Sequence, residues 1–218
     1  MAHSDNSGLA SSFTDLMTSL AVIFILLLCI TNNEARQQSI NMRNIILLKL
    51  KKELNVFTQR GLKIKQDPKD PLALLIIVPK GLLDFKVDQS EIPPKGKDFL
   101  ALFIPKLANV VCDKKFRDDI NSIVVEGHTD STGTDQYNWE LSQKRSMAVV
   151  DESLNILDSK NPHLRDDFVE FISASGRGRT DLIKNSNGTE NRGLSRRVIF
   201  KIRVRSIEQR VITKVIPK

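Results

Sequence analysis

Residues that build metal sites, disulfide frameworks and base-stacking surfaces are scarce in this chain. Its 218 residues include two cysteines, Cys29 and Cys112, and three histidines, with no metal-ligand spacing among them. We therefore expect no metal ion and no cofactor. One Trp and one Tyr are too few for the stacking surface of a single-strand nucleic-acid binder. The net charge of +7 favours an anionic neighbour, such as lipid headgroups or cell wall, or a basic surface that meets only solvent, and we expect no direct contact with nucleic acid.

Basic residues are also absent from the first 35 positions, which bears on membrane topology. Residues 9–30 contain one charge, Asp15, and are long enough to cross the roughly 30 Å hydrocarbon core as a helix. We predict a transmembrane helix over 13–31 after a tail of residues 1–12. A cleaved signal peptide would need a basic segment, which this tail lacks. The alternative is a lipoprotein site at Cys29, but a leucine precedes it where a small residue is expected.

The segment after the span carries a helical pattern and then a break. Residues 32–71 are predicted to form a juxtamembrane helix and a linker, with apolar side chains at helical spacing over 39–57. The sequence QDPKDP at 66–71 contains two prolines, which break a helix. This segment is therefore the predicted linker to the domain that follows.

Residues 72–205 alternate between strand-like and helix-like patterns, and residues 206–218 are predicted to be a C-terminal tail. The predicted strands are 72–78, 120–127, 167–176 and 196–204, and the predicted helices are 93–111 and 137–157. The order β-α-β-α-β-β predicts an α+β domain with a mixed sheet. A domain of this length can bury a hydrophobic core of its own.

The segment VEGHTDSTGTDQYNWELSQKRS, residues 125–146, combines a polar loop with a helix that carries charge. Asp130 follows a predicted strand, and Arg145 lies on the helix after the loop. A carboxylate and a forked guanidinium can together hold a zwitterion, with Asp130 binding an ammonium group and Arg145 binding a carboxylate. On spacing alone, the two side chains could instead pair with each other or cap the helix.

This segment, together with the later GRGR and RRVIFKI, resembles the peptidoglycan-binding domain of the OmpA C-terminal family, shared with Pal and the MotB stator subunit. The resemblance covers residues 72–205. It implies that Asp130 and Arg145 bind the diaminopimelate end of the wall peptide, and that the residues beside them in the site are Thr129, Tyr137, Asn138 and Leu141. Ser195 departs from the family pattern, which has Asn before the two arginines. The family implies a binding protein, not an enzyme.

Asp15 is unusual because a carboxylate inside an apolar span is costly and commonly marks an ion path. The sequence DLMTSLAVIF resembles the membrane helices of MotB subunits, which implies that Asp15 carries H⁺ or Na⁺ and that Thr18 and Ser19 support the path. The apolar surroundings favour the neutral carboxyl, so it can load and release an ion. The alternative is an interfacial Asp with the span starting after it.

The resemblance also implies an assembly and an orientation. In the ion-driven motors that this chain resembles, two copies of the MotB-like subunit, called the B subunit, are surrounded by five copies of a MotA- or ZorA-like membrane subunit. We therefore expect a homodimer with such a partner. The basic flank after the span favours a cytoplasmic C-terminal part. A wall-binding domain must instead be periplasmic, so we expect a single-pass inner-membrane protein with a cytoplasmic N-terminus. The compact layout with its short linker resembles the B subunit of the Zorya anti-phage system. A flagellar stator subunit and a Pal-like structural protein are the alternatives.

Overall fold

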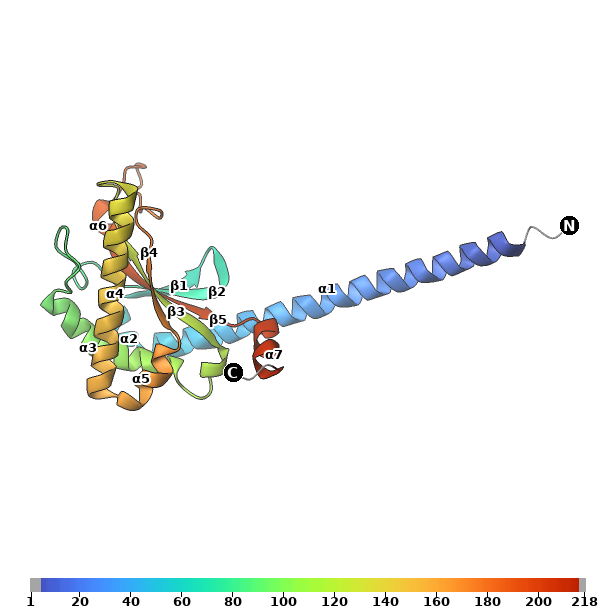
Figure 1. Cartoon of the computed structure of the whole chain (residues 1–218), viewed down its shortest axis with the longest axis horizontal. Helices are drawn as coiled ribbons and strands as arrows, with labels where there is room; N and C mark the ends of the chain where they lie inside the picture. The colour runs from blue at the N-terminus through green and yellow to red at the C-terminus, as the bar shows by residue number, and fades with distance from the viewer. Residues whose placement is uncertain (1–4, 216–218) are drawn as a thin grey trace.

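One long helix, α1 (Asp5–Glu53), contains both predicted N-terminal helices (Figure 1). The computed structural model describes residues 5–215. At 1.5 Å per residue, the 49 residues of α1 extend roughly 73 Å. The helix is unbroken because residues 9–60 contain no Gly or Pro. It begins within the predicted tail, so residues 5–12 are helical, while residues 1–4 of that tail lie outside the described residues.

The two halves of α1 have different surroundings. Side chains of residues 11–34 are exposed, and α1 is the one described helix long and apolar enough to cross a membrane. From Ser39 onward one face is buried, including Arg43, Ile46 and Leu50. The C-terminal half of α1 therefore belongs to the core of the domain.

After α1, a short helix α2 (Asn55–Thr58) leads into a hairpin of β1 (Lys63–Asp67) and β2 (Asp70–Ile77). The predicted linker at 66–71 was wrong, because these residues form the end of β1, the turn and the start of β2. Pro68 lies in the turn, where proline is readily accommodated. The domain accordingly begins before residue 72.

The sheet has five strands in the order β1-β2-β5-β3-β4. The remaining strands are β3 (Ile120–His128), β4 (Ile172–Gly176) and β5 (Arg197–Val204). Only the β3–β4 pair is parallel within the described sheet, so the α+β class and the mixed sheet are confirmed.

Helices complete the domain. Their bounds are α3 (Pro94–Val111), the 3₁₀ turn η1 (Arg117–Asp119), α4 (Asp135–Lys160), α5 (Pro162–Val169), α6 (Arg192–Ser195) and α7 (Ile207–Val215). The strand predicted over 167–176 was wrong at its start, where α5 ends and the chain turns before Ile172. The predicted C-terminal tail contains α7, and its residues 216–218 lie outside the described residues.

The core joins the end of α1 and α2 to the sheet through aromatic side chains. Phe57 meets Phe99 and Phe103 of α3 edge-on, with ring centroids 5.7 Å apart in both pairs. Phe103 in turn lies 5.1 Å from Phe200 on β5. Such aromatic pairs add to the stabilisation that burial alone provides. Residues before 63 are thus part of one packed domain.

Candidate ligand-binding site

The loop between β3 and α4 is fixed by close packing at its start and a cap at its end. A side chain at Gly127 would collide with the backbone carbonyl of Ser142, so glycine lets β3 approach α4 closely. Thr134 is the N-cap of α4, and its Oγ1 accepts a hydrogen bond of 3.2 Å from the Tyr137 backbone N–H. The alternative in which Asp130 caps the helix is therefore wrong.

Asp130 is buried at the start of this loop and has two hydrogen-bond donors. Its Oδ1 accepts from the Thr132 backbone N–H at 2.9 Å, and its Oδ2 accepts from Arg196 Nη1 at 2.6 Å. Burial alone raises the pKa of Asp130, but these donors outweigh it and hold the pKa below its ordinary value. Asp130 is thus a paired carboxylate at neutral pH, and its cationic partner is Arg196.

Arg145 is buried on α4 and holds the loop between β2 and α3. Its Nε donates to Gln89 O at 2.9 Å, and its Nη2 donates to Lys86 O at 3.0 Å. The guanidinium also lies over the Phe85 ring, 5.2 Å from the centroid. Burial lowers the pKa of Arg145, but an arginine remains charged. Arg145 thus donates to the backbone of this loop while Asp130 pairs with Arg196, so the alternative of a direct pair between Asp130 and Arg145 is wrong.

The other four predicted site residues lie around this loop and helix. The Tyr137 hydroxyl donates to Asp88 Oδ1, and this bond raises the pKa of Tyr137. Asn138 is buried and donates through Nδ2 to Thr132 O at 2.8 Å. Thr129 is buried and donates its backbone N–H to Gly178 O at 3.0 Å, and Leu141 is half-buried. The structure therefore brings the six residues into one region.

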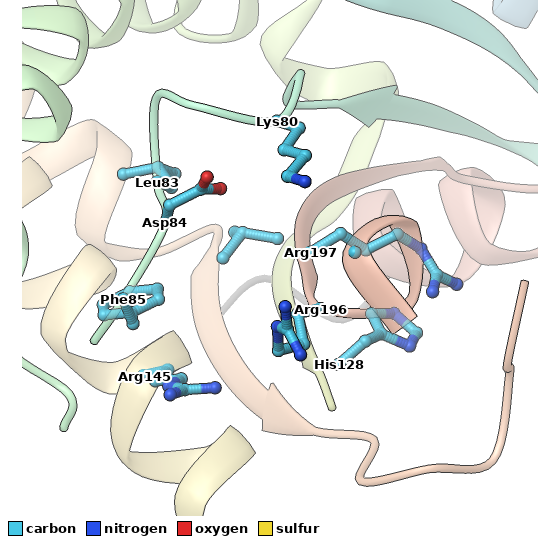
Figure 2. A pocket seen from close by; sticks show the side chains of 11 residues that line it. Lys80, Leu83, Asp84, Phe85, His128, Arg145, Arg196 and Arg197 are labelled. Carbon is cyan, nitrogen blue, oxygen red and sulfur yellow. The ribbon is translucent and has the colours of Figure 1, made fainter. Parts of the chain in front are cut away.

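A pocket of about 150 Å³ opens beside Arg145 (Figure 2). Figure 2 shows Lys80, Arg145 and Arg196 around this hollow, each contributed by a different segment. The residues that line it are Lys80, Leu83, Asp84, Phe85, Gly127, His128, Arg145, Gly193, Arg196, Arg197 and Val198. The lining includes one lysine and three arginines but only one carboxylate, that of Asp84. The pocket can therefore hold a carboxylate by charge-assisted hydrogen bonds.

His128 lies under the pocket in an environment that disfavours its charge. The ring is buried, and its Nε2 lies 3.6 Å from Glu126 Oε2, which is longer than a normal hydrogen bond. Burial lowers the pKa of His128 and Arg197 lowers it further, while Glu126 opposes both. His128 is therefore neutral at pH 7.

Sequence reasoning missed several residues of the pocket. Lys80, Asp84 and Phe85 come from the irregular segment between β2 and α3, which carries no motif by itself. Arg196 was noted only as half of an arginine pair, and that pair was the available signal. Ser195 is buried and its Oγ accepts from the Ile183 backbone N–H at 3.0 Å, so the serine supports the loop before α6.

The predicted membrane residues belong to the N-terminal half of α1, which extends away from the sheet (Figure 1). Asp15, Thr18 and Ser19 are exposed on residues 11–34 of α1, called here the bare half of the helix. Their i, i+3, i+4 spacing places them on one face. Thr18 Oγ1 donates to Thr14 O at 2.7 Å, an internal bond common for Thr in helices. The two predicted functional groups are therefore separate, joined by one continuous helix.

The structure combines an N-terminal helix that is long and apolar enough to cross a membrane with an α+β domain that carries a cationic pocket. The sequence matches the OmpA family over residues 84–196, more than half of the chain, and the chain belongs to that family. Outer membrane protein A of Bordetella avium is 26% identical over 145 residues, which cover 65% of this chain and 66% of that protein. The chain thus spans just under two thirds of that relative.

Two further likenesses cover more of the chain than the OmpA family match does. The Zorya protein ZorB of Escherichia coli is 26% identical over 208 residues, covering 88% of this chain and 86% of that protein. A solved MotB-like protein from Desulfovibrio vulgaris has a similar fold, with a TM-score of 0.53 and 22% identity over 78% of this chain and 98% of that one. The chain therefore belongs to the OmpA family, is similar in sequence to ZorB, and has a fold similar to that of a MotB-like protein.

Proposed function

We propose that this chain is the B subunit of a Zorya-type, ion-driven motor that is anchored to peptidoglycan. The observation that carries the proposal is the likeness to ZorB, because it covers more of the chain than the OmpA-like domain does. Asp15 in the bare half of α1 fits the ion-driven part of that function, and the cationic pocket in the domain fits the anchoring to peptidoglycan. We expect no enzymatic activity.

The pocket end of the domain is the proposed wall-binding site: Arg145 lines the pocket, and Asp130 lies beside it, paired with the lining residue Arg196. Gln89 O and Lys86 O engage two of the five N–H donors of Arg145, so the guanidinium retains donors for a ligand carboxylate. The Asp130 carboxylate accepts two bonds and has capacity for a ligand ammonium. Diaminopimelate carries both groups at one end, which makes it a suitable ligand.

Retention on purified sacculi tests this assignment. The full chain should be used in detergent, because a fragment starting at residue 60 would lose the core residues Ile46, Leu50 and Leu54. Arg145→Ala should weaken retention by about 1.5–3 kcal/mol, the range for a hydrogen bond to a charged group. Lys144→Ala removes a neighbouring exposed charge and should bind like the parent chain. Equal retention of all three proteins would contradict the proposed site.

The membrane half supplies the proposed ion path, with Asp15 loading H⁺ or Na⁺ and Thr18 and Ser19 beside it. In this arrangement the N-terminus is cytoplasmic and the domain is periplasmic. Two chains would stand inside five MotA- or ZorA-like subunits, which would shield the carboxylate from lipid. Native mass spectrometry of the co-expressed complex should show two copies of this chain. A complex with a single copy would contradict the motor assignment.

A wall anchor without ion transport is the second candidate, favoured by the match to the OmpA family. In a Pal-like protein, Cys29 would be lipidated at a new N-terminus. The intact mass of the purified chain distinguishes the two, because the motor subunit retains its first 28 residues. Neighbouring genes for a multi-pass partner with a long cytoplasmic tail would favour the Zorya type over a flagellar stator subunit.

A further inference from the structure

The C-terminal helix α7 meets α1 at the point where the apolar span ends. Residues of both helices line a shared corner of about 600 Å³, namely Leu28, Thr31, Asn32 and Ala35 of α1 and Ile207, Glu208, Val211 and Ile212 of α7. Figure 1 shows α7 with one end against α1 and extending to one side of it, near the place where α1 leaves the domain. An ion pair of 2.9 Å between Arg210 Nη1 and Asp119 Oδ1 ties α7 to the end of η1, directly before β3.

The exposed side of α7 at this corner is apolar. Val211 is 55% exposed and Ile212 is 58% exposed, and both line the corner together with Leu28. Leu28 lies one helical turn before Asn32, the first polar amide after the apolar run. The apolar side chains of α7 are therefore level with the end of the span, and no described residue covers them.

The position of the domain places this corner at a membrane surface. The first buried residue of the domain half, Ser39, lies eight residues beyond Thr31, or roughly 12 Å along a helix. If α1 crosses the bilayer to Thr31, a helix that extends to one side of α1 at this level lies along the surface of the bilayer. A short amphipathic helix in that position buries its apolar face between headgroups and acyl chains.

We propose that α7 docks on the lipid surface at the outer end of the span, with Val211 and Ile212 inserted at the headgroup boundary. The proposal rests on the membrane placement given above for α1. It supplies a second contact between domain and membrane, besides α1 itself. α7 is tied to the residue before β3, and the pocket lies at the opposite end of β3. The contact of α7 with lipid would therefore hold the cationic pocket on the side away from the lipid.

Fluorophores on single cysteines of the full chain in phosphatidylethanolamine–phosphatidylglycerol nanodiscs test the proposal. Burial raises the pKa of Cys112 to about 12, so that thiol stays unlabelled while exposed cysteines react. In a Cys29→Ser background, Val211→Cys and Ile212→Cys place the label on α7. Ser186→Cys places it on the exposed loop before α6 as a control, and native Cys29 reports on the span itself.

Lipids carrying a nitroxide near the headgroup should remove most of the fluorescence at positions 211 and 212 and at Cys29, but not at position 186. If only Cys29 is quenched, α7 does not dock on lipid and the proposal is overturned. Disulfide cross-links between two Val211→Cys chains without quenching would assign the corner to a second copy instead. If Cys29 is also unquenched, the membrane placement of α1 fails, which is a separate result from the failure of α7.

Discussion

The bare and docked halves of α1 are one continuous helix in two different surroundings. Over residues 11–34 the side chains are exposed all round, and most of them are apolar. Over residues 39–53 only one face is apolar and buried, with Ile46 and Leu50 fully enclosed by the domain. The first pattern matches a helix surrounded by lipid, and the second matches a helix packed on one side.

This difference shows how a single helix can connect the two proposed functional sites without a break in the helix. In the bare half every side chain is exposed and α7 meets only its C-terminal end, so we expect a partner or a bilayer to cover the rest. The docked half depends on the core, to which it contributes from the middle of α1 to Phe57. Substitutions in the two halves should consequently have different effects, one on activity and the other on stability.

The largest expected effect is a loss of activity in the Asp15→Asn variant, which changes the bare half of α1. Asn is nearly the same size but cannot change its charge, so an ion-driven cycle through this position would stop. Phage protection should be lost, or motility if the chain serves a flagellar stator, while the protein level and sacculus retention stay normal. Asp15→Glu keeps the charge but moves it, and should restore part of the activity at most. Full protection by the Asn variant would show that this carboxylate is not the ion-carrying group.

In the docked half, Leu50→Ala should destabilise the domain. Leu50 is fully buried, so the variant loses packing and leaves a cavity at a cost of about 2–5 kcal/mol. Leu48→Ala is the matched control, because Leu48 is 67% exposed on the same helix and should cost less than about 0.5 kcal/mol. Denaturant unfolding of the full chain in detergent, followed by the fluorescence of Trp139, measures both. Equal losses would show that the C-terminal half of α1 is not docked as described.

The sequence predicted the α+β class, both long helices of the domain and four of the five strands. It did not predict β1, because KIKQD has little apolar character and forms an edge strand, for which exposed lysines are typical. It also placed a linker at 66–71, where the two prolines belong to a hairpin. Local patterns cannot show that a polar segment pairs with a buried neighbour.

The candidate site was predicted in part, for a similar reason. The motif on β3 and α4 gave Asp130 and Arg145, and the structure places both in the same region. The structure adds that each is already held, Asp130 by Arg196 and Arg145 by the segment between β2 and α3. Arg196 lies 66 positions from Asp130, and Gln89 and Lys86 lie 56 and 59 positions from Arg145, so these partners follow from the fold and not from spacing.

The smallest expected effect is a dependence of domain stability on pH through His128. Burial lowers the pKa of this ring below its ordinary value of about 6.5, so the unfolded chain binds the proton more readily. Stability should therefore fall as the pH drops through about 6.5 toward the lower pKa of the folded state. Asp130 also has a lowered pKa, but its effect begins only below about pH 4, so the two do not overlap.

Unfolding of the full chain at about pH 7.5 and about pH 5.5 measures the contribution of His128 to domain stability. The parent chain should be less stable at the lower pH, because burial lowers the pKa of His128 in the fold and the unfolded chain therefore takes up the proton first. His128→Gln cannot take up the proton and should lose less, whereas His163→Gln, at an exposed position on α5, should behave like the parent. An unchanged pH slope in the His128 variant would mean that the ring is protonated as easily in the fold as in water. The docked half of α1 shares its core with β3, whereas the bare half has no contact with this histidine. Any loss of stability between these two pH values should therefore affect the domain and leave the span unchanged.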